Sequence, residues 1–461
     1  MVLGWRLRRK SNKKKSLKAM KVEIPNHFLC PISFDLMKDP VTLSTGITYD
    51  RENIEKWLEE GNFTCPVTNQ ILHNFDMIPN HSIRKMIQEW GLENQKHGFQ
   101  RIPTPRIPIT PIEVTNILSF IESSSRQLDT SSCLEALKKI KQWGTESHHR
   151  NKRCMVANGA AEVLSAAFKS FATEPFEENS IVCEEILSNL AWMFPIGKIA
   201  RNHLKSEASL RCMIQFLTRV ETNISTKENS IKTLEELIIF YDVEDDQNQT
   251  YTLLEFLSKI EGVNEILMEF IQNKVSNKIT KSTLMIIYQM VSTTPSLEIT
   301  ILSFLEMGLI SSLLEILVDS HDDQENNKVI ISERALGIMD SVLSYYQGRV
   351  KAYENDLTIP ILVKKLLRVS NLATEFSVSS IWKLCMNGVV EQEKEELRSV
   401  VLVETLQVGG FQKLLLIIQV GCGYETKEKA TEVLKLLNPY RPQLECIESI
   451  DYKSLQRFCF N

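Results

Sequence analysis

Two cysteines that are each followed by proline, Cys30 and Cys65, constrain the N-terminal part of this 461-residue chain more than any other feature. A zinc site built from loops commonly takes its thiolates in pairs, with two residues between the cysteines. The positions where each second cysteine would stand hold Ser33 and Thr68. The sequence therefore predicts a small two-loop domain in which hydrogen-bonding side chains replace the metal, and we expect no metal or other cofactor.

The residues around these pairs, 23–97, predict a hairpin and two helices. Apolar residues alternate on both sides of residues 44–46, which is typical of a short hairpin. Asp50 and Asn80 are good N-caps for the two helices. A domain of this size without metal or disulfides is marginally stable, so polar side chains must hold its loops. The candidates for that scaffold are Ser33, Asp39, Asp50, Arg51, Thr68 and Asn80.

The first 22 residues form a basic arm that contains nine cations and no acid, although the whole chain has a net charge of −5. The arm offers little apolar surface to bury and is predicted to be disordered. A solubilising tail, a nuclear-import patch and a contact with anionic lipid headgroups are its three open interpretations. Because the cations are not spread over a folded face, we do not expect a nucleic-acid-binding protein.

The ten cysteines are scattered, and no two have C-x-x-C spacing. No signal peptide and no apolar run long enough to span a membrane is evident. These observations indicate free thiols in a reducing compartment. We therefore expect a cytoplasmic location, with nuclear and membrane-peripheral locations left open by the basic arm.

Four prolines in residues 98–111 predict an extended linker. From residue 112 to 461, 3–4 apolar spacing predicts helix after helix. A small residue or glycine followed by an apolar helix recurs six times in this part. Its anchor residues are Asn158, Glu207, Glu261, Glu306, Asn355 and Gln407. A period near 50 residues favours an α-solenoid of the armadillo or HEAT type, and an irregular helical bundle is the alternative.

Four motifs in residues 24–97 resemble the U-box of plant ubiquitin ligases: FLCPISFDLMKDPV, TGITYDRENIEKWL, CPVT and IPNHSIRKMI. The residues from 112 onward are similar to the armadillo repeats that follow the U-box in many of these ligases. The resemblance implies a mainly α protein in which a small zinc-free, RING-like module precedes an armadillo solenoid.

The resemblance also implies a groove for a ubiquitin-conjugating enzyme (E2) between the two loops and the first helix. The matching positions are Ile32 and Phe34 on the first loop, Trp57 on the helix and Pro66 on the second loop. Some U-boxes place an arginine directly after the CPVT motif to clamp E2 and ubiquitin. This chain has Asn69 there, which can form hydrogen bonds but carries no charge.

The implied function is that of an E3 ubiquitin ligase without a catalytic residue of its own. The module would bring a ubiquitin-charged E2 to a lysine of a protein substrate held in the armadillo groove. The implied partners are thus E2, ubiquitin and the substrate, while a homodimer and a membrane contact through the basic arm remain open. The alternative is a non-catalytic armadillo adaptor that uses a degenerate U-box for docking or dimerisation.

Overall fold

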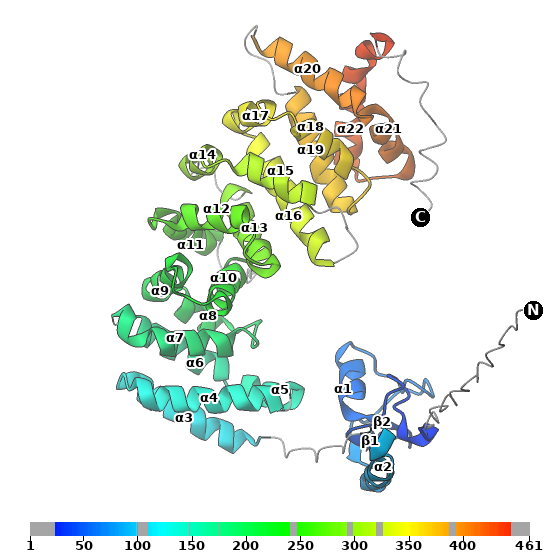
Figure 1. Ribbon diagram of the computed structural model, residues 1–461, viewed down its shortest axis with the longest axis vertical. Coiled ribbons are helices and arrows are strands. Elements are labelled where there is room, and N and C mark those ends of the chain that lie inside the picture. Colours follow the sequence, from blue (N-terminus) through cyan, green and yellow to red (C-terminus); the bar gives the residue numbers. More distant parts are fainter. Residues whose placement is uncertain are drawn as a thin grey trace, which may run out of the picture. The chain divides into compact units, whose positions relative to one another are not determined.

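The computed structural model describes residues 24–97, 99, 109–146, 148–173, 175–239, 247–292, 298–319, 326–386 and 393–443. The basic arm, most of the predicted linker, Cys446 and Cys459 lie outside these ranges. The chain divides into two compact units, with the boundary between Pro108 and Ile109. Figure 1 shows a small unit of strands and short helices and a long stack of helices.

The N-terminal unit has a three-stranded antiparallel sheet and two α-helices. Its elements are η1 (Asn26–Phe28), β1 (Pro40–Thr42), β2 (Thr48–Asp50), α1 (Arg51–Glu59), β3 (Ile78–Pro79), α2 (His81–Glu93) and η2 (Gln95–His97). The strands lie in the order β2-β1-β3, with Val41 opposite Tyr49. The predicted hairpin is confirmed, because β1 and β2 pair on both sides of the turn at Gly46, whose φ is +80°.

The core of this unit is small and lies between the sheet, the two helices and the two loops. Its buried side chains include Cys30, Tyr49, Ile54, Cys65 and Ile87. Burial of apolar surface at about 25 cal/mol per Å² is the main favourable contribution to such a fold. Because this core contains few residues, the hydrogen bonds of the loops make an important contribution to the stability of the unit.

The C-terminal unit is a stack of helices that begins with α3 (Pro111–Arg126) and α4 (Thr130–Glu146) and continues as six three-helix repeats. These repeats are α5 (His148–Ala157), α6 (Ala160–Ala172) and α7 (Phe176–Leu190); α8 (Lys198–Leu204), α9 (Glu207–Thr218) and α10 (Ile224–Ile239); α11 (Gln247–Lys259), α12 (Val263–Asn273) and α13 (Asn277–Ser292); α14 (Glu298–Glu306), α15 (Leu309–Asp319) and α16 (Asn326–Leu343); α17 (Tyr346–Tyr353), α18 (Thr358–Lys365) and α19 (Asn371–Met386); α20 (Glu393–Gln407), α21 (Gly410–Val420) and α22 (Tyr424–Leu437), which η4 (Asn438–Gln443) follows.

The helices are arranged in rows, as expected for a solenoid. The third helices pack on one another from α7 to α22, with α4 before them, and the second helices pack in a neighbouring row from α6 to α18, with α3 before them. Figure 1 shows this succession of layers from cyan to red. A single continuous core runs through the unit. The predicted solenoid is therefore confirmed, and the irregular bundle is wrong.

Each of the six anchor residues found in the sequence lies at the entrance to a second helix. In four repeats the turn before that helix uses a glycine with a left-handed backbone: Gly159, Gly262, Gly308 and Gly409, with φ between +78° and +86°. The other two entrances use side-chain hydrogen bonds. Ser206 accepts from the Ser209 N–H group, and Asn355 accepts from the Leu357 N–H group. The recurring sequence pattern thus marks a turn that is made either by a left-handed glycine or by a side-chain hydrogen bond.

The solenoid begins at residue 109, three residues before the predicted start at residue 112. Pro111 is the first residue of α3, and Thr110 forms a capping box with Glu113. Ile109 packs against the solenoid core, and its N–H group donates to the Asn151 side chain. Residues 109–111, assigned to the linker from their proline content, therefore belong to the folded unit.

The cysteines in the described ranges are free thiols, six of them buried and two half-buried. In the same ranges no single helix is long and apolar enough to cross a membrane. Two bent helix pairs, Glu298–Glu306 with Leu309–Val318 and Arg398–Gln407 with Gly410–Val420, meet that criterion of length and composition only when each pair is counted together.

Candidate functional site: two loops on one helix

The two loops, residues 29–39 and 63–72, share one backbone design. In each loop the N–H group of the cysteine donates to the carbonyl five residues later, at 2.8 Å for Cys30 and 2.9 Å for Cys65. The cysteine carbonyl accepts from the residue four positions on, Phe34 or Asn69, at 2.8 Å in both loops. Phe34 and Asn69 both have a left-handed backbone, with φ of 59° and 56°. The two cysteine–proline pairs thus initiate the same tight turn twice.

Within the second loop, the Cys65 thiol is the centre of a hydrogen-bond cluster. Its Sγ atom lies 3.0 Å from the Tyr49 hydroxyl and accepts from the Thr45 hydroxyl at 3.3 Å. The Tyr49 oxygen accepts from the Val67 N–H group at 3.3 Å. Burial alone would raise the pKa of Cys65, but hydrogen bonds from Thr45, Thr68 and Tyr49 outweigh it and lower the pKa to about 6. Burial likewise raises the pKa of Tyr49, which keeps its hydroxyl a donor.

The first loop is anchored through Asp50, which was predicted to cap α1. Asp50 does stand at the N-cap position, but its side chain forms no capping hydrogen bond. Its Oδ1 atom instead accepts from the N–H groups of Lys38 and Asp39, at 3.0 and 2.8 Å. The capping role is therefore wrong, because this buried carboxylate accepts from two loop donors instead. The Asp50 N–H group itself donates to the Cys30 Sγ atom at 3.3 Å.

Arg51 and Asn80 complete the connections of the sheet to the loops and helices. The Arg51 Nε atom forms an ion pair with Asp39 at 2.7 Å, and both side chains are largely buried. The Asn80 amide donates to the hydroxyls of Thr42 and Thr48, at 3.2 and 3.3 Å. Its Oδ1 atom caps α2 by accepting from the Ile83 N–H group, as predicted.

Both loops are also held by α1 itself. The Asn53 amide donates to the Ser33 hydroxyl at 3.0 Å, and the Trp57 indole N–H group donates to the Thr64 carbonyl at 2.8 Å. Residues four positions apart lie on the same face of a helix. One face of α1 therefore reaches the first loop through Asn53 and the second loop through Trp57.

The apolar residues assigned to the E2 groove lie around this face. Ile32, Trp57 and Pro66 are half-buried, whereas Phe34 is 75% exposed. Ile32 and Phe34 flank Ser33, which Asn53 contacts, and Pro66 follows two residues after Thr64, which Trp57 contacts. Asn69 is exposed at the tip of the second loop.

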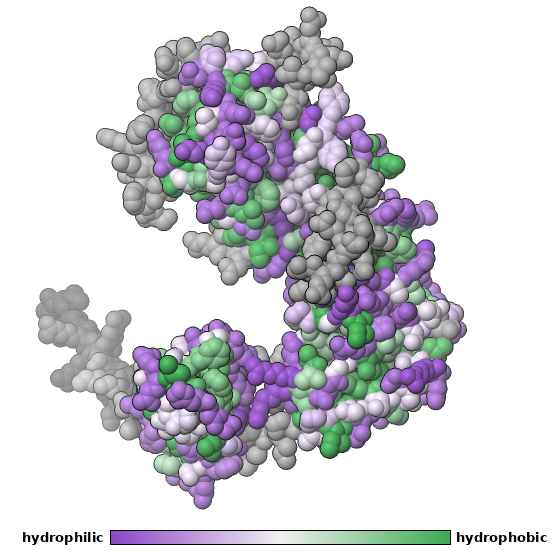
Figure 2. Space-filling view, turned by 180° about the vertical axis from the view of Figure 1, so that it is seen from behind, coloured by the Kyte–Doolittle hydropathy of each residue, from purple (hydrophilic) through white to green (hydrophobic). Residues whose placement is uncertain are grey.

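A large aromatic side chain in a left-handed, exposed position costs conformational energy and gains no burial in this structure. The first loop therefore leaves the Phe34 ring facing solvent. Figure 2 shows that apolar patches interrupt the hydrophilic surface of this unit. Exposed Phe63, Ile71, Phe75 and Ile78 contribute apolar surface besides the predicted groove.

Sequence reasoning missed Asn53 and the acceptor role of the two thiols. Asn53 lies within the motif TGITYDRENIEKWL, but nothing in the sequence distinguished it from the other polar residues of that helix. The repeated cysteine–proline pairs were a signal for the thiols, but which hydroxyls approach them depends on the folded hairpin. No group of three metal-ligating side chains is present within the described ranges.

The row of third helices in the solenoid carries polar contacts between neighbouring layers. Lys141 of α4 pairs with Glu185 of α7 at 3.1 Å, and Lys278 of α13 pairs with Glu228 of α10 at 3.2 Å. Exposed pairs of this kind contribute at most about 1 kcal/mol each. They connect neighbouring layers along the surface of this row.

One group of polar contacts in this row is buried and connects three layers. Glu235 of α10 accepts from Ser282 of α13 at 2.6 Å and from Arg334 of α16 at 2.7 Å. Arg334 also donates to the carbonyl of Lys281. The carboxylate therefore joins three consecutive third helices.

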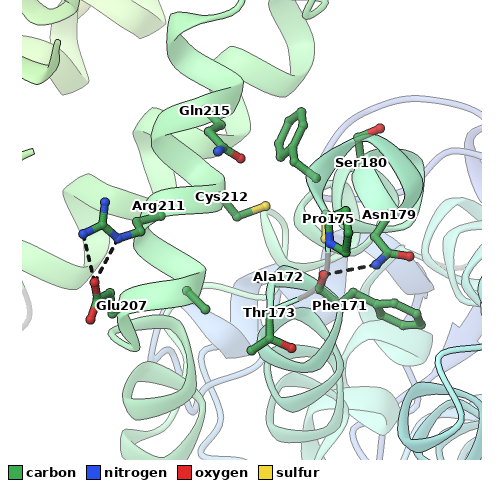
Figure 3. Close-up of a pocket in the computed structure, with 13 residues that line it drawn as sticks. Phe171, Ala172, Thr173, Pro175, Asn179, Ser180, Glu207, Arg211, Cys212 and Gln215 are labelled. Carbon is green, nitrogen blue, oxygen red and sulfur yellow. Dashed lines mark hydrogen bonds and ion pairs between the residues drawn. The ribbon is translucent and has the colours of Figure 1, made fainter. Parts of the chain in front are cut away.

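Figure 3 shows a pocket of about 740 Å³ between α6, α7 and α9. The Asn179 amide donates to the Phe171 carbonyl at 3.4 Å, and Arg211 forms an ion pair with Glu207 across one turn of α9. The thiols of Cys183 and Cys212 lie in contact at its wall, and their hydrogen bond, with burial, holds the pKa of Cys183 well above its usual range. The lining groups largely satisfy one another, so this pocket contains no pre-formed reactive constellation.

The fold and the two-loop site define the class of protein: a small two-loop module joined to an armadillo-type solenoid. Comparison with known proteins gives the same division. The family model of the U-box domain matches residues 24–96, and that of the plant U-box protein ARM repeat region matches residues 113–457. Together these two matches cover almost all of the described chain.

Relatives from Arabidopsis thaliana match over nearly the whole length. U-box domain-containing protein 21 is 39% identical over 99% of this chain and 100% of the relative. E3 ubiquitin-protein ligase PUB22 is 33% identical over 90% of this chain and 94% of the relative. The chain therefore belongs to the plant U-box proteins with an armadillo-repeat region, a family of E3 ubiquitin ligases.

Proposed function

We propose that this ligase acts as a scaffold that forms no covalent intermediate with ubiquitin. The two loops and α1 bind an E2 whose cysteine carries ubiquitin as a thioester. The amine of a substrate lysine attacks the thioester carbonyl, an isopeptide bond forms, and the E2 thiol leaves. The ligase accelerates this step by bringing the reactants together and by restricting their orientation.

The observation that carries the proposal is the apolar set on the loops, exposed Phe34 with half-buried Ile32 and Pro66, beside Trp57 of α1. An aromatic anchor among a few apolar contacts suits a small, transient interface. Because two loops and one helix supply the set, an E2 would contact all three elements at once. The groups that could bind ubiquitin itself are fewer, and Asn69 at the tip of the second loop is our candidate for the clamp.

The lack of a covalent step is supported by the burial of the module's cysteines. A thioester-forming ligase needs a thiolate that the ubiquitin C-terminus can reach. The lowered pKa of Cys65 would favour a thiolate, but its Sγ atom is fully buried and engaged by Tyr49 and Thr45. Cys30 is equally buried. We therefore assign both thiols to the loop structure.

The test is a reaction of the full chain with E1, a panel of E2s, ubiquitin and ATP. With at least one E2, wild type should form ubiquitin conjugates, including conjugates on itself. Ile32→Ala should lower the rate at least about tenfold, as expected for an interface anchor. Ile112→Ala, which truncates an exposed isoleucine of the solenoid, is the matched control and should keep the rate. Asn69→Ala should slow conjugation less than Ile32→Ala does.

Three results would overturn the proposal. A ubiquitin adduct on this chain that thiol reductants remove would establish a covalent step. Full activity of a folded Ile32→Ala variant would show that E2 does not bind in the proposed groove. If no E2 of the panel supports conjugation, the non-catalytic adaptor becomes the better description.

The substrate is expected along the row of third helices, and deletion of the solenoid should abolish substrate conjugation but leave E2 binding.

A further inference from the structure

We infer that Asn53 is a positioning residue for the E2 groove: its hydrogen bond to Ser33 sets where the first loop stands relative to Trp57. The inference rests on the proposed function, since it concerns the same groove. Asn53 is not among the residues predicted for the groove or for the loop scaffold, and its side chain is only half-buried. Its relevance comes from what it contacts.

The contact lies at a sensitive place in the first loop. Ser33 stands between Ile32 and Phe34, the two apolar residues that this loop presents. Its hydroxyl oxygen accepts from the Asn53 amide at 3.0 Å and from the Asp35 N–H group at 3.3 Å. One side chain from α1 is thus connected to the centre of the loop tip.

The base of the loop is held independently of Asn53. Asp50 binds the N–H groups of Lys38 and Asp39, and Arg51 binds the Asp39 side chain. The Cys30 turn closes through its own backbone hydrogen bonds. Loss of Asn53 should therefore leave the domain folded and the loop closed, while the loop tip gains freedom relative to α1.

The second loop has an equivalent tether on the same helix face. The Trp57 indole donates to the Thr64 carbonyl, four residues after Asn53. The two tethers share the rigid backbone of α1, so together they determine the separation between the tip of the first loop and the base of the second loop. An E2 that contacts both loops binds more tightly when this separation is fixed in advance, because less conformational freedom is lost on binding.

The experiment measures ubiquitin transfer by the full chain as a function of the concentration of ubiquitin-charged E2. Asn53→Ala should raise KM for the charged E2 about 3- to 10-fold, which corresponds to loss of one net hydrogen bond. The rate at saturating E2 should remain close to wild type, because bound E2 still meets the same groove. The melting temperature of the variant should also stay close to wild type.

The double-mutant cycle with Ser33 separates positioning from general damage. Ser33→Ala removes the acceptor and should raise KM by a similar factor, and the double variant should be no worse than either single one. Asn74→Ala is the matched control, since Asn74 is exposed and donates only locally, to Asp76 at 2.6 Å. It should leave KM unchanged.

The outcomes are distinguishable from failure of the proposed function. If wild type is inactive with every E2, the proposed function fails. If wild type is active and Asn53→Ala has the wild-type KM, or if the effects of Asn53→Ala and Ser33→Ala multiply in the double variant, the positioning role is refuted. A fall in the saturating rate without a change in KM would also refute it.

Discussion

The Sγ atom of Cys65 accepts hydrogen bonds from residues of three separate segments, so this single thiol connects the hairpin to the second loop. The Tyr49 hydroxyl comes from β2, the Thr45 hydroxyl from the hairpin turn, and Thr68 from the loop itself. A cysteine in a zinc site would connect the same segments through the metal. Here hydroxyl groups do so, and a thiolate is the form that they stabilise.

This arrangement predicts a pH dependence for the stability of the U-box. The folded-state pKa of Cys65 is about 6, whereas its ordinary value is 9.0, so between these values the unfolded chain binds more protons. Stability should therefore rise with pH in this window, by at most about 1.4 kcal/mol per pH unit, and be lost as pH falls towards 6. Pulse proteolysis of the full chain in urea, with cleavage followed within residues 24–97, measures the free energy of unfolding of the U-box at each pH.

Two variants serve as controls for that pH dependence. Cys65→Ser keeps an acceptor but does not ionise in this range, so its stability should lose the rise between pH 6 and 9. Tyr49→Phe removes one hydrogen-bond donor to the Cys65 sulfur, so the folded-state pKa of Cys65 should rise. The pH range over which stability rises should therefore become narrower. Parallel stability curves for wild type and Cys65→Ser would show that the thiol does not ionise as described.

At the scale of elements, the solenoid was more predictable from the sequence than the U-box scaffold. The six anchor residues lie at the entrances of second helices because a turn and an apolar helix leave a local pattern. The scaffold depends on contacts between residues distant in the chain, such as Asn80 with Thr42 and Thr48. The sequence indicated which polar residues were available, but the partner of Asp50 and the role of Asn53 required the folded loops.

The left-handed glycines of the solenoid give a prediction for one such turn. At Gly308, φ is +85° and no atom lies within 4 Å of the place that a Cβ atom would take, so a side chain there meets only backbone strain. Gly308→Ala should lower solenoid stability by about 1–2 kcal/mol, and Gly308→Asn by less, since asparagine tolerates this conformation better. Urea unfolding of the full chain measures both. Equal losses for the two variants would contradict the backbone explanation.

At the scale of the whole molecule, the chain combines two units with different sources of stability. The U-box has a small core reinforced by buried polar contacts, whereas the solenoid has one continuous apolar core with ties such as Glu235 to Arg334. The order of the units along the chain, and the function of the family, were predictable from four motifs and a repeat. The start of the solenoid was not, because Ile109 joins its core from within a proline-rich stretch.

If the groove acts as proposed, the U-box itself stimulates transfer of ubiquitin from a charged E2. Single-turnover discharge tests this directly: a purified, ubiquitin-charged E2 is mixed with free lysine and the full chain, and loss of the thioester is followed with time. Wild type should accelerate discharge by at least about tenfold over E2 alone, with ubiquitin appearing on lysine and never as a thioester on the ligase. Discharge at the rate of E2 alone, with an E2 that another ligase does stimulate, would contradict it.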